Sequence, residues 1–397
     1  MSRARRLCFL VNPLAGIGGP LALKGSDGEA GWEALRRGAA LVSPRRAERF
    51  ARSLAALATG RVSGGGVVFY TAGGLMGASI LGRHGMPYTV VYEPEGWPTT
   101  REDTIRLVEA CIEKGVELVV FVGGDGTARD VVSVTGRRTP VLGVPSGVKM
   151  YSAVFAESPE AAALALHEWL EGRASLCDAE VLDIDEDAFR SGVLRVRLYG
   201  YARTVCAPGM VTVSKQPTIG GSDVRENIDA IARYIVEGME DCTLYVLGPG
   251  TTLAAVAEQL GIEKTLLGVD VVHNRRLVAR DVDEETLYRI VSRHASGGGK
   301  VRIIVTPIGG QGFILGRGNQ QISPRVVRAA GGKRAVVVVS PRSKLARTPV
   351  LRVDTGDPSL DAEFSGYIRV VVDYGEEQLV RVSTGAGYER PGKRRAG

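Results

Sequence analysis

The sequence has no apolar run that approaches the roughly 20 residues needed for a membrane-spanning helix. Its first apolar stretch, LCFLV, stops at Asn12 and Pro13 and is too short for the apolar core of a signal peptide. A buried first strand accounts for this stretch better. We therefore expect a cytoplasmic protein that has no membrane partner.

Cysteine, histidine and aromatic residues are scarce. The cysteines are scattered and odd in number, so we expect buried thiols and no cysteine-ligated metal. They are Cys8, Cys111, Cys177, Cys206 and Cys242. The 4 histidines form no cluster, which argues against a histidine-ligated transition metal. Aromatic residues make up 6% of the chain and do not alternate with basic ones, so no stacking platform for single strands is indicated.

The charge of the chain is mildly basic, with a formal net charge of +6. Such a surface suits a small anionic substrate. The one dense basic run, ERPGKRRAG at residues 389–397, fits a frayed terminus better than a nucleic-acid site, so we expect no nucleic-acid partner. With 397 residues, two domains are the default expectation.

Buried strands alternate with helices before residue 150. The predicted strands are RLCFLVNP (6–13), VVFYTA (67–72), YTVVYE (88–93), ELVVFVGG (117–124) and TPVLGVPSG (139–147). The predicted helices between them are 44–60 and 99–115, and an alanine-rich helix at 158–172 would close this unit. This alternation is typical of an α/β fold with a parallel sheet covered on both faces, in which ligands bind at the carboxyl ends of the strands.

The second half of the chain repeats the order of strand, glycine-rich turn and helix. Residues 242–262 and 300–331 follow it, 222–239 predict a helix, and 333–341 predict another buried strand. We therefore place a boundary near residue 175. The expected parts are an N-terminal α/β domain at 1–175, a C-terminal substrate- or nucleotide-binding domain at 176–345, and closing strands with a basic tail at 346–397.

The string GGDGT at residues 123–127 combines small residues with one carboxylate. Gly123 and Gly124 follow a strand, and we expect positive φ angles there that direct N–H groups inward. Gly126 leaves room for a phosphate, and Thr127 can cap the next helix and bind a phosphate oxygen. Asp125 would then accept the proton of an attacking hydroxyl or help to hold Mg²⁺. A plain strand-to-helix turn capped by Asp125 is the alternative.

The first predicted strand also ends in a glycine-rich segment, LVNPLAGIGG (10–19). Asn12 and the glycines would form either a loop that approaches phosphate or a simple strand-ending turn. The segment has neither a P-loop nor the spacing of a dinucleotide fingerprint. Lys24 and Asp27, soon after, could face the phosphates or form a polar turn.

Three further polar segments follow predicted strands. Ser146, Gly147 and Lys149 should lie at the same sheet edge as Asp125, where Lys149 could neutralise a phosphate or be a solvated loop residue. LGPGTT offers an anion or ribose site, or a plain turn, whereas GGQGFILGRGNQQISP offers amide and guanidinium groups for a nucleotide. The candidates in these last two segments are Gly248, Gly250, Thr251, Thr252, Gln311, Arg317, Asn319 and Gln320.

Together, NPLAG (12–16) and GGDGT resemble the NAD kinase, diacylglycerol kinase and phosphofructokinase-like superfamily. The strings GVPSGVKMYSAVFA, LGPGTT, LLGVDVV, ARDVDE and GGQGFILGRGNQQISP are similar to those of proteins described as predicted ATP- or polyphosphate-dependent NAD kinases. This resemblance covers nearly the whole chain.

The resemblance implies a three-layer α/β N-terminal domain and a largely β-built second domain, with the active site between them. It implies transfer of the terminal phosphate of ATP or polyphosphate to the 2′-hydroxyl of the adenosine ribose in NAD. Asp125 matches the general base of the family, the other GGDGT residues match its phosphate-contacting turn, and Asn12 matches the asparagine of its first loop. Mg²⁺ is expected on the donor phosphates, and a homo-oligomer is the family's common state.

The resemblance has one clear departure. Ordinary NAD kinases follow GGDGT with a G-x-x-G-F-L segment and then an Asn-Glu pair that helps to hold the dinucleotide, and GVPSGVKMYSAVFA has neither. Two alternatives therefore stand beside NAD phosphorylation. One is the same phosphoryl transfer to another hydroxyl acceptor, such as a lipid or a polyol, and the other is a non-catalytic nucleotide-binding regulator.

Overall fold

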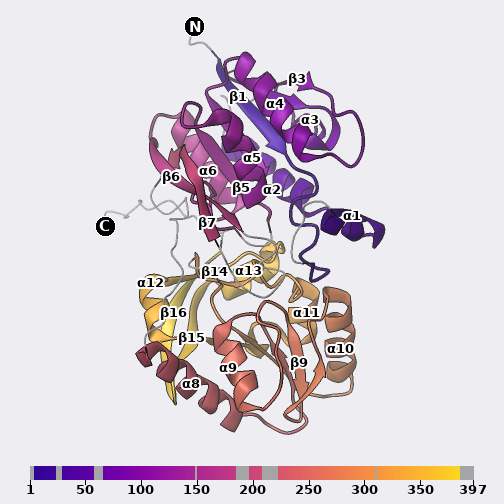
Figure 1. Cartoon of the computed structure of the whole chain (residues 1–397), viewed down its shortest axis with the longest axis vertical. Coiled ribbons are helices and arrows are strands. Elements are labelled where there is room, and N and C mark those ends of the chain that lie inside the picture. The colour runs from indigo at the N-terminus through magenta and orange to yellow at the C-terminus, as the bar shows by residue number, and fades with distance from the viewer. Residues whose placement is uncertain are drawn as a thin grey trace, which may run out of the picture.

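The chain forms two α/β domains, one above the other in Figure 1, each built on a sheet with helices on both faces. The computed structural model describes residues 4–23, 29–57, 66–147, 150–184, 196–207, 222–308 and 311–384. Within those ranges no helix combines the length and the apolar character that crossing a membrane requires.

The first domain contains a sheet whose strand order is β3-β2-β1-β4-β5-β7-β6. Its strands are β1 Arg5–Val11, β2 Val67–Ala72, β3 Tyr88–Tyr92, β4 Leu118–Gly123, β5 Val141–Pro145, β6 Ser175–Ile184 and β7 Val196–Cys206. The first five are mutually parallel, as expected, and β4 is buried along its whole length. The first sheet extends past the boundary expected near residue 175. The antiparallel pair β6–β7 joins it, with β7 beside β5.

Helices cover both faces of this sheet, which confirms the three layers. The helical segments of this domain are α1 Glu29–Arg36, α2 Val42–Leu57, η1 Gly74–Met76, α3 Ala78–Arg83, α4 Arg101–Glu113, α5 Asp125–Thr135 and α6 Pro159–Leu170. α2, α3 and α6 pack on one face, and α4 and α5 pack on the other. α4 begins with a capping box formed by Thr100 and Asp103, which satisfies backbone groups at the start of the helix.

The second domain contains a larger mixed sheet, in the order β10-β9-β8-β11-β13-β15-β16-β14-β12. Its strands are β8 Leu244–Leu247, β9 Asp270–His273, β10 Arg276–Ala279, β11 Val301–Val305, β12 Phe313–Leu315, β13 Val336–Val339, β14 Val350–Val353, β15 Gly366–Asp373 and β16 Glu376–Thr384. β8, β11, β13 and β15 are mutually parallel. The closing strands expected after residue 346 lie inside this sheet, which confirms a second domain rich in strands.

The helices of the second domain again cover two faces. They are α8 Ser222–Glu237, α9 Thr251–Gln259, α10 Glu284–Ser296, α11 Pro324–Ala329, η3 Gly332–Ala335, α12 Arg342–Arg347 and α13 Pro358–Phe364. α8 and α9 pack on one face, and α10, α11 and α13 pack on the other. The helix predicted at 222–239 and the strand-turn-helix order of 242–262 are confirmed.

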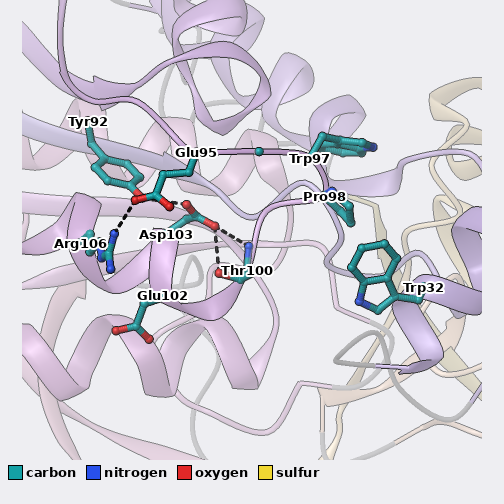
Figure 2. Close-up of a pocket in the computed structure, with 10 residues that line it drawn as sticks. Trp32, Tyr92, Glu95, Trp97, Pro98, Thr100, Glu102, Asp103 and Arg106 are labelled. Atoms are coloured by element: carbon teal, nitrogen blue, oxygen red, sulfur yellow. Dashed lines mark hydrogen bonds and ion pairs between the residues drawn. The ribbon is translucent and has the colours of Figure 1, made fainter.

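The carboxyl ends of the parallel strands of the first sheet share one edge. β1 ends there at Val11 and β4 ends there at Gly123, and each strand leads into one of the two glycine-rich segments. The edge strand β3 ends beside a pocket that contains Trp32 and Trp97 (Figure 2). The fold thus gathers several polar strand ends along one line.

The cysteines differ from the expectation of scattered buried thiols. Cys177 and Cys206 form a disulfide between β6 and β7, with a Cα–Cα distance of 5.9 Å. Cys8 and Cys111 are buried thiols, as expected, whereas Cys242 is exposed. The spacing of 29 residues along the chain carried no signal for this pair, because the pairing of two adjacent strands brings them together.

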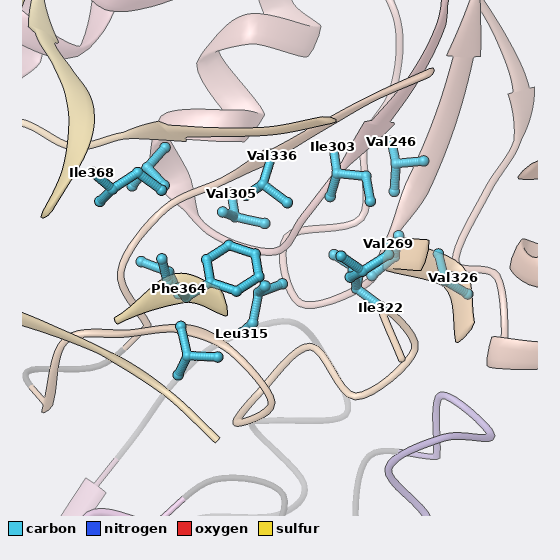
Figure 3. Close-up of a cluster of buried hydrophobic side chains, with 14 of the residues drawn as sticks. Val246, Val269, Ile303, Val305, Leu315, Ile322, Val326, Val336, Phe364 and Ile368 are labelled. Carbon is cyan, nitrogen blue, oxygen red and sulfur yellow. The ribbon is translucent and has the colours of Figure 1, made fainter. Parts of the chain in front are cut away.

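A core cluster of the second domain is mostly aliphatic (Figure 3). Phe364, at the end of α13, is fully buried among residues of several strands, including Val305 and Leu315. Removing such a ring leaves a cavity that the surrounding strands cannot close.

Phe364→Ala is therefore expected to lower the free energy of unfolding by about 3–5 kcal/mol. Tyr367→Ala is the matched control, because this aromatic residue follows closely in the chain and its side chain is 65% exposed. We expect the control to cost less than about 1 kcal/mol. Chemical denaturation measures both, and equal losses would contradict the described packing.

Candidate functional site

The GGDGT turn joins β4 to α5 at the edge of the first sheet. Gly124 precedes the helix with a φ of −117°, and neither Gly123 nor Gly124 takes a positive φ, so that expectation was wrong. Close packing requires the glycines instead. A Cβ on Gly123 would lie 2.4 Å from the Cβ of Thr127, and a Cβ on Gly147 would lie 2.8 Å from the Cα of Gly124.

Asn12 and Thr127 meet across the two glycine-rich turns. The Nδ2 of Asn12 donates to the Oγ1 of Thr127 over 3.0 Å, and the backbone N–H of Leu14 donates to the Oδ1 of Asn12 over 3.1 Å. Thr127 lies inside the first turn of α5 and is not its cap, in contrast to the expectation. The first loop and the GGDGT turn therefore form one polar unit.

Asp125 begins α5, and its side chain is buried. Its Oδ2 accepts the backbone N–H of Tyr151 over 2.7 Å, and its Oδ1 accepts that of Ser152 over 2.9 Å. Burial raises the pKa of the Tyr151 hydroxyl, and the charge of Asp125 raises it further, so this phenol stays protonated. Asp125 is thus a carboxylate held by the chain that follows β5.

The segment after β5 lies against the GGDGT turn, as expected. The N–H of Ser146 donates to the carbonyl of Gly123 over 2.9 Å, but its hydroxyl donates to Ser43 of α2 over 3.1 Å and does not face the turn. Gly16 of the first loop packs on the same strand end, where a Cβ would lie 2.0 Å from the carbonyl oxygen of Ser146. Lys149 lies outside the described residues, as do Lys24 and Asp27.

Gln311 connects the second domain to the loop that holds Asp125. Its Nε2 donates to the carbonyl of Met150 over 3.1 Å, and its Oε1 accepts from Arg317 over 3.2 Å. Met150 precedes the two residues that bind the Asp125 carboxylate. Gln311 is therefore placed to couple the position of the second domain to the position of Asp125.

Asn319 and Gln320, two further candidates of this loop, differ in role. Asn319 is fully buried; its Nδ2 donates to the carbonyl of Ile314 over 2.9 Å, and its Oδ1 accepts from Gly316 over 3.0 Å. These bonds shape the loop and occupy both ends of the amide. The side chain of Gln320 lies against the first loop, since a Cβ on Gly19 would come within 2.0 Å of its Oε1.

The LGPGTT turn occupies the corresponding edge of the second sheet. Gly250 takes a φ of +122°, precedes α9 and donates its N–H to the carbonyl of Leu266 over 2.8 Å. Thr251 is exposed, and Thr252 is buried. Because β8 is parallel to β11, the Gly248–Gly250 turn shares its edge with the segment that leads from β11 to Gln311 and the first domain.

A buried set of charges joins the two domains. Asp354, after β14, pairs with Arg46 of α2, with Arg49 at 3.4 Å and with Arg317 at 3.6 Å. Burial raises the pKa of Asp354, but the guanidinium groups of Arg46, Arg317 and Arg49 outweigh it and lower the pKa to about 2. Asp354 is therefore an anion at neutral pH.

Two more arginine contacts extend this junction. Arg317 donates to the backbone carbonyl of Glu157, and Arg352 pairs with the carboxylate of Glu157. Burial lowers the pKa of Arg317 to about 10. Arg317 was a candidate for binding a nucleotide, but in the structure it fixes the second domain against the segment before α6.

Asp361 lies next to this set with a different charge state. Both the N–H and the hydroxyl of Thr355 donate to its Oδ1, over 2.9 Å and 2.5 Å. Burial is the main cause that raises the pKa of Asp361. The hydrogen bond from the Thr355 hydroxyl lowers it, and the negative charge of Asp354 raises it again. The resulting pKa is about 6. This carboxyl group is therefore half protonated near pH 6.

Several residues of the junction escaped the sequence analysis. Arg46 lies in a helix that was predicted, where a basic residue is usually solvated, and Asp354 follows a short strand with no motif. The loop from Met150 to Ser152 acts through its backbone, which no side-chain pattern reveals. The one available signal was its position after a strand next to that of Asp125.

The chain is a two-domain α/β protein whose domains meet around a buried carboxylate at a strand-to-helix turn. The family model for the ATP-NAD kinase N-terminal domain matches residues 9–174, and that for the ATP-NAD kinase C-terminal domain matches residues 240–382. The chain therefore belongs to the ATP-NAD kinase family, which confirms the resemblance. Neither a curated protein nor a solved structure matches it.

The titration of Asp361 predicts a pH effect on stability. Its pKa of about 6, against an ordinary 3.8, means that the folded state binds more protons than the unfolded state between these values. The free energy of unfolding should fall by about 2–3 kcal/mol as the pH rises from 4 to 7 through this group alone. Asp361→Asn keeps an oxygen for Thr355 and should remove that decline.

Asp357→Asn serves as the control, because a hydrogen bond from Arg328 lowers the pKa of Asp357 below 3.8. Its effect on stability should be constant across this pH range. Urea denaturation at several pH values measures all three proteins. Parallel pH profiles for the parent and Asp361→Asn would contradict the raised pKa.

Proposed function

We propose that the protein transfers the terminal phosphate of ATP or polyphosphate to a nucleotide hydroxyl, most directly the 2′-hydroxyl of the adenosine ribose of NAD. The observation that supports this most is the placement of Asp125. Its buried carboxylate lies between the Asn12–Thr127 pair and the loop from Met150 to Ser152, where the two domains meet. Membership of the ATP-NAD kinase family agrees with this reaction.

Asp125 serves as the general base in this proposal. Its carboxylate is positioned by the backbone N–H groups of Tyr151 and Ser152. A carboxylate at this place can take up the proton of the acceptor hydroxyl. The hydroxyl oxygen then forms a bond to the terminal phosphorus of the donor, and the bridging phosphorus–oxygen bond breaks, which leaves the shortened donor as product.

The turn around Asp125 supports binding of the donor phosphates. The first N–H groups of an α-helix have no carbonyl partner within the helix, so the start of α5 favours an anion. Gly126 has no side chain to obstruct a phosphate, and Thr127 and Asn12 add polar groups beside it. The carboxylate and the phosphate-binding groups thus belong to the same turn.

A magnesium ion fits this arrangement through its substrate. Among the described residues, no group of three His, Cys, Asp or Glu is placed to hold a metal. Mg²⁺ in kinases takes most of its ligands from phosphates and waters, so it can be held mainly by the donor. When bound, Mg²⁺ supplies neutralisation of the charge on the phosphates.

Domain closure would exclude water as a competing acceptor. Gln311 and Gln320 reach from the second domain to the loop after β5 and to the first loop. A lipid or polyol acceptor would use the same phosphate turns, and a non-catalytic regulator would not need the carboxylate. These alternatives differ in the product formed and in the effect of replacing Asp125.

Asp125→Asn is expected to lower the rate of NADP formation by about 10²–10⁴-fold, because an amide cannot take up the proton. Binding of ATP and NAD should persist, since the amide keeps the shape of the side chain. The assay mixes protein, Mg²⁺, NAD and either ATP or polyphosphate, and it detects NADP with an NADP-specific dehydrogenase. Calorimetry measures ligand binding in parallel.

Asp130→Asn provides the matched control. Asp130 lies on the same helix with the same 6% exposure as Asp125, but its carboxylate pairs with Arg101 and Arg129. We expect near-parental turnover from it. Parental turnover from Asp125→Asn would reject the base, whereas absence of NADP from the parent with both donors would reject NAD as the acceptor.

A further inference from the structure

A pocket of about 340 Å³ lies at the carboxyl end of β3, apart from the turns that surround Asp125 (Figure 2). The loop between β3 and α4, the start of α4 and one residue of α1 form its walls. This volume is at the lower end of the range typical of small-molecule sites, about 300–1,000 Å³. The pocket can hold one ring system but not a whole dinucleotide.

Two indole side chains form the apolar part of the pocket. Trp32 comes from α1, and Trp97 comes from the loop after β3; they are 51% and 52% exposed. The chain's third tryptophan, Trp169, is only 9% exposed and packs in the core of the first domain. Figure 2 shows Trp32 and Trp97 on the same side of the pocket, with Pro98 near both. Large aromatic faces left in solvent from two separate elements suit a flat ligand.

The opposite side of the pocket is polar and fixed by hydrogen bonds. The hydroxyl of Tyr92 donates to one oxygen of Asp103 over 2.7 Å, and the backbone N–H of Thr100 donates to the other over 2.6 Å. Burial raises the pKa of Asp103, but the hydrogen bonds from Thr100 and Tyr92 outweigh it, so that the pKa lies below its ordinary value. These hydrogen bonds therefore favour the negatively charged form of Asp103.

The remaining charged groups leave the pocket acidic. Glu95 pairs with Arg106 at 3.2 Å, which cancels one charge. Glu102 and Asp103 add two carboxylates to the lining, so three carboxylates face one guanidinium. Such a field disfavours phosphates and favours a cation.

Flat indole faces and an acidic lining together select a planar aromatic cation, because tryptophan is the best partner for cation–π contacts. We propose that this pocket binds the positively charged pyridinium ring of an oxidised nicotinamide nucleotide. A neutral base would lack the electrostatic gain, and a phosphate group would be repelled. The assignment of the ring to a substrate rests on the proposed function, whereas binding of the cation does not.

The position of the pocket agrees with an acceptor that reaches Asp125. β3, β2, β1 and β4 are successive neighbours in the sheet, so the ends of β3 and β4 lie about 14 Å apart at a strand spacing of about 4.8 Å. The pyridinium ring and the adenosine ribose are at opposite ends of NAD, with a pyrophosphate between them. The ring can therefore occupy the pocket while the ribose hydroxyl lies near Asp125.

The test uses 1-methylnicotinamide, a cation that carries the ring without a nucleotide. The full-length protein should shift the ring-proton NMR signals upfield in a saturable way, because the indole faces shield a stacked ring. Trp97→Leu should weaken this affinity by about 5- to 30-fold, and Glu102→Gln should weaken it in the same direction. Trp169→Phe is the control and should leave the affinity unchanged.

Two ligands with a neutral ring test whether the charge of the ring matters for binding. Neutral nicotinamide should bind more weakly than 1-methylnicotinamide, and NADH should bind more weakly than NAD. Both differences in affinity should shrink in Glu102→Gln. Equal affinity for charged and neutral rings, or an unchanged affinity in Trp97→Leu, would overturn the proposal. Because the probe needs no turnover, cation binding by a protein that forms no NADP would reject the proposed reaction and still support the pocket.

Discussion

The carboxylate of Asp125, which accepts two backbone N–H groups from Tyr151 and Ser152, is the interaction on which the rest of the site depends. It ties the turn after β4 to the segment after β5. Since Met150 of that segment accepts a hydrogen bond from Gln311, the same carboxylate is linked to the second domain. Glycines make the contact possible by letting the two strand ends touch. The residue that performs the proposed chemistry is thus also the residue that organises its surroundings.

The charges at the junction add a second set of contacts between the domains. Asp354 is surrounded by Arg46, Arg49 and Arg317, which belong to both domains. A buried carboxylate without such partners would be strongly destabilising, and here three guanidinium groups offset its charge. The planar guanidinium groups also make directional contacts that a lysine could not replace. Two different kinds of contact, one at the reacting group and one beside it, therefore hold the same junction.

Much of the fold could be predicted from the sequence, because its strands are buried apolar runs and its turns contain glycine. The GGDGT turn, Asn12 and the partnership of the two domains followed from local strings. What could not be predicted depends on pairing between distant segments. The β6–β7 hairpin joins the first sheet through contacts with β5, the disulfide depends on that hairpin, and Arg46 meets Asp354 across 308 positions of the chain. Gly123 and Gly124 show a further limit. Their residue type pointed correctly to this turn, but close packing requires glycine there, and a positive φ angle does not.

The charged junction has a consequence for how such a sequence can diverge. Its members come from four separated segments, and each guanidinium or carboxylate is balanced by groups on another segment. Residues that share one network couple by about 0.5–3 kcal/mol, so replacing one changes the cost of keeping the others. Substitutions at Arg46, Glu157, Arg317 and Asp354 should therefore be inherited as a set. Lineages that lose one partner would be expected to lose the opposite charge as well, and to exchange the ionic junction for an apolar one as a whole.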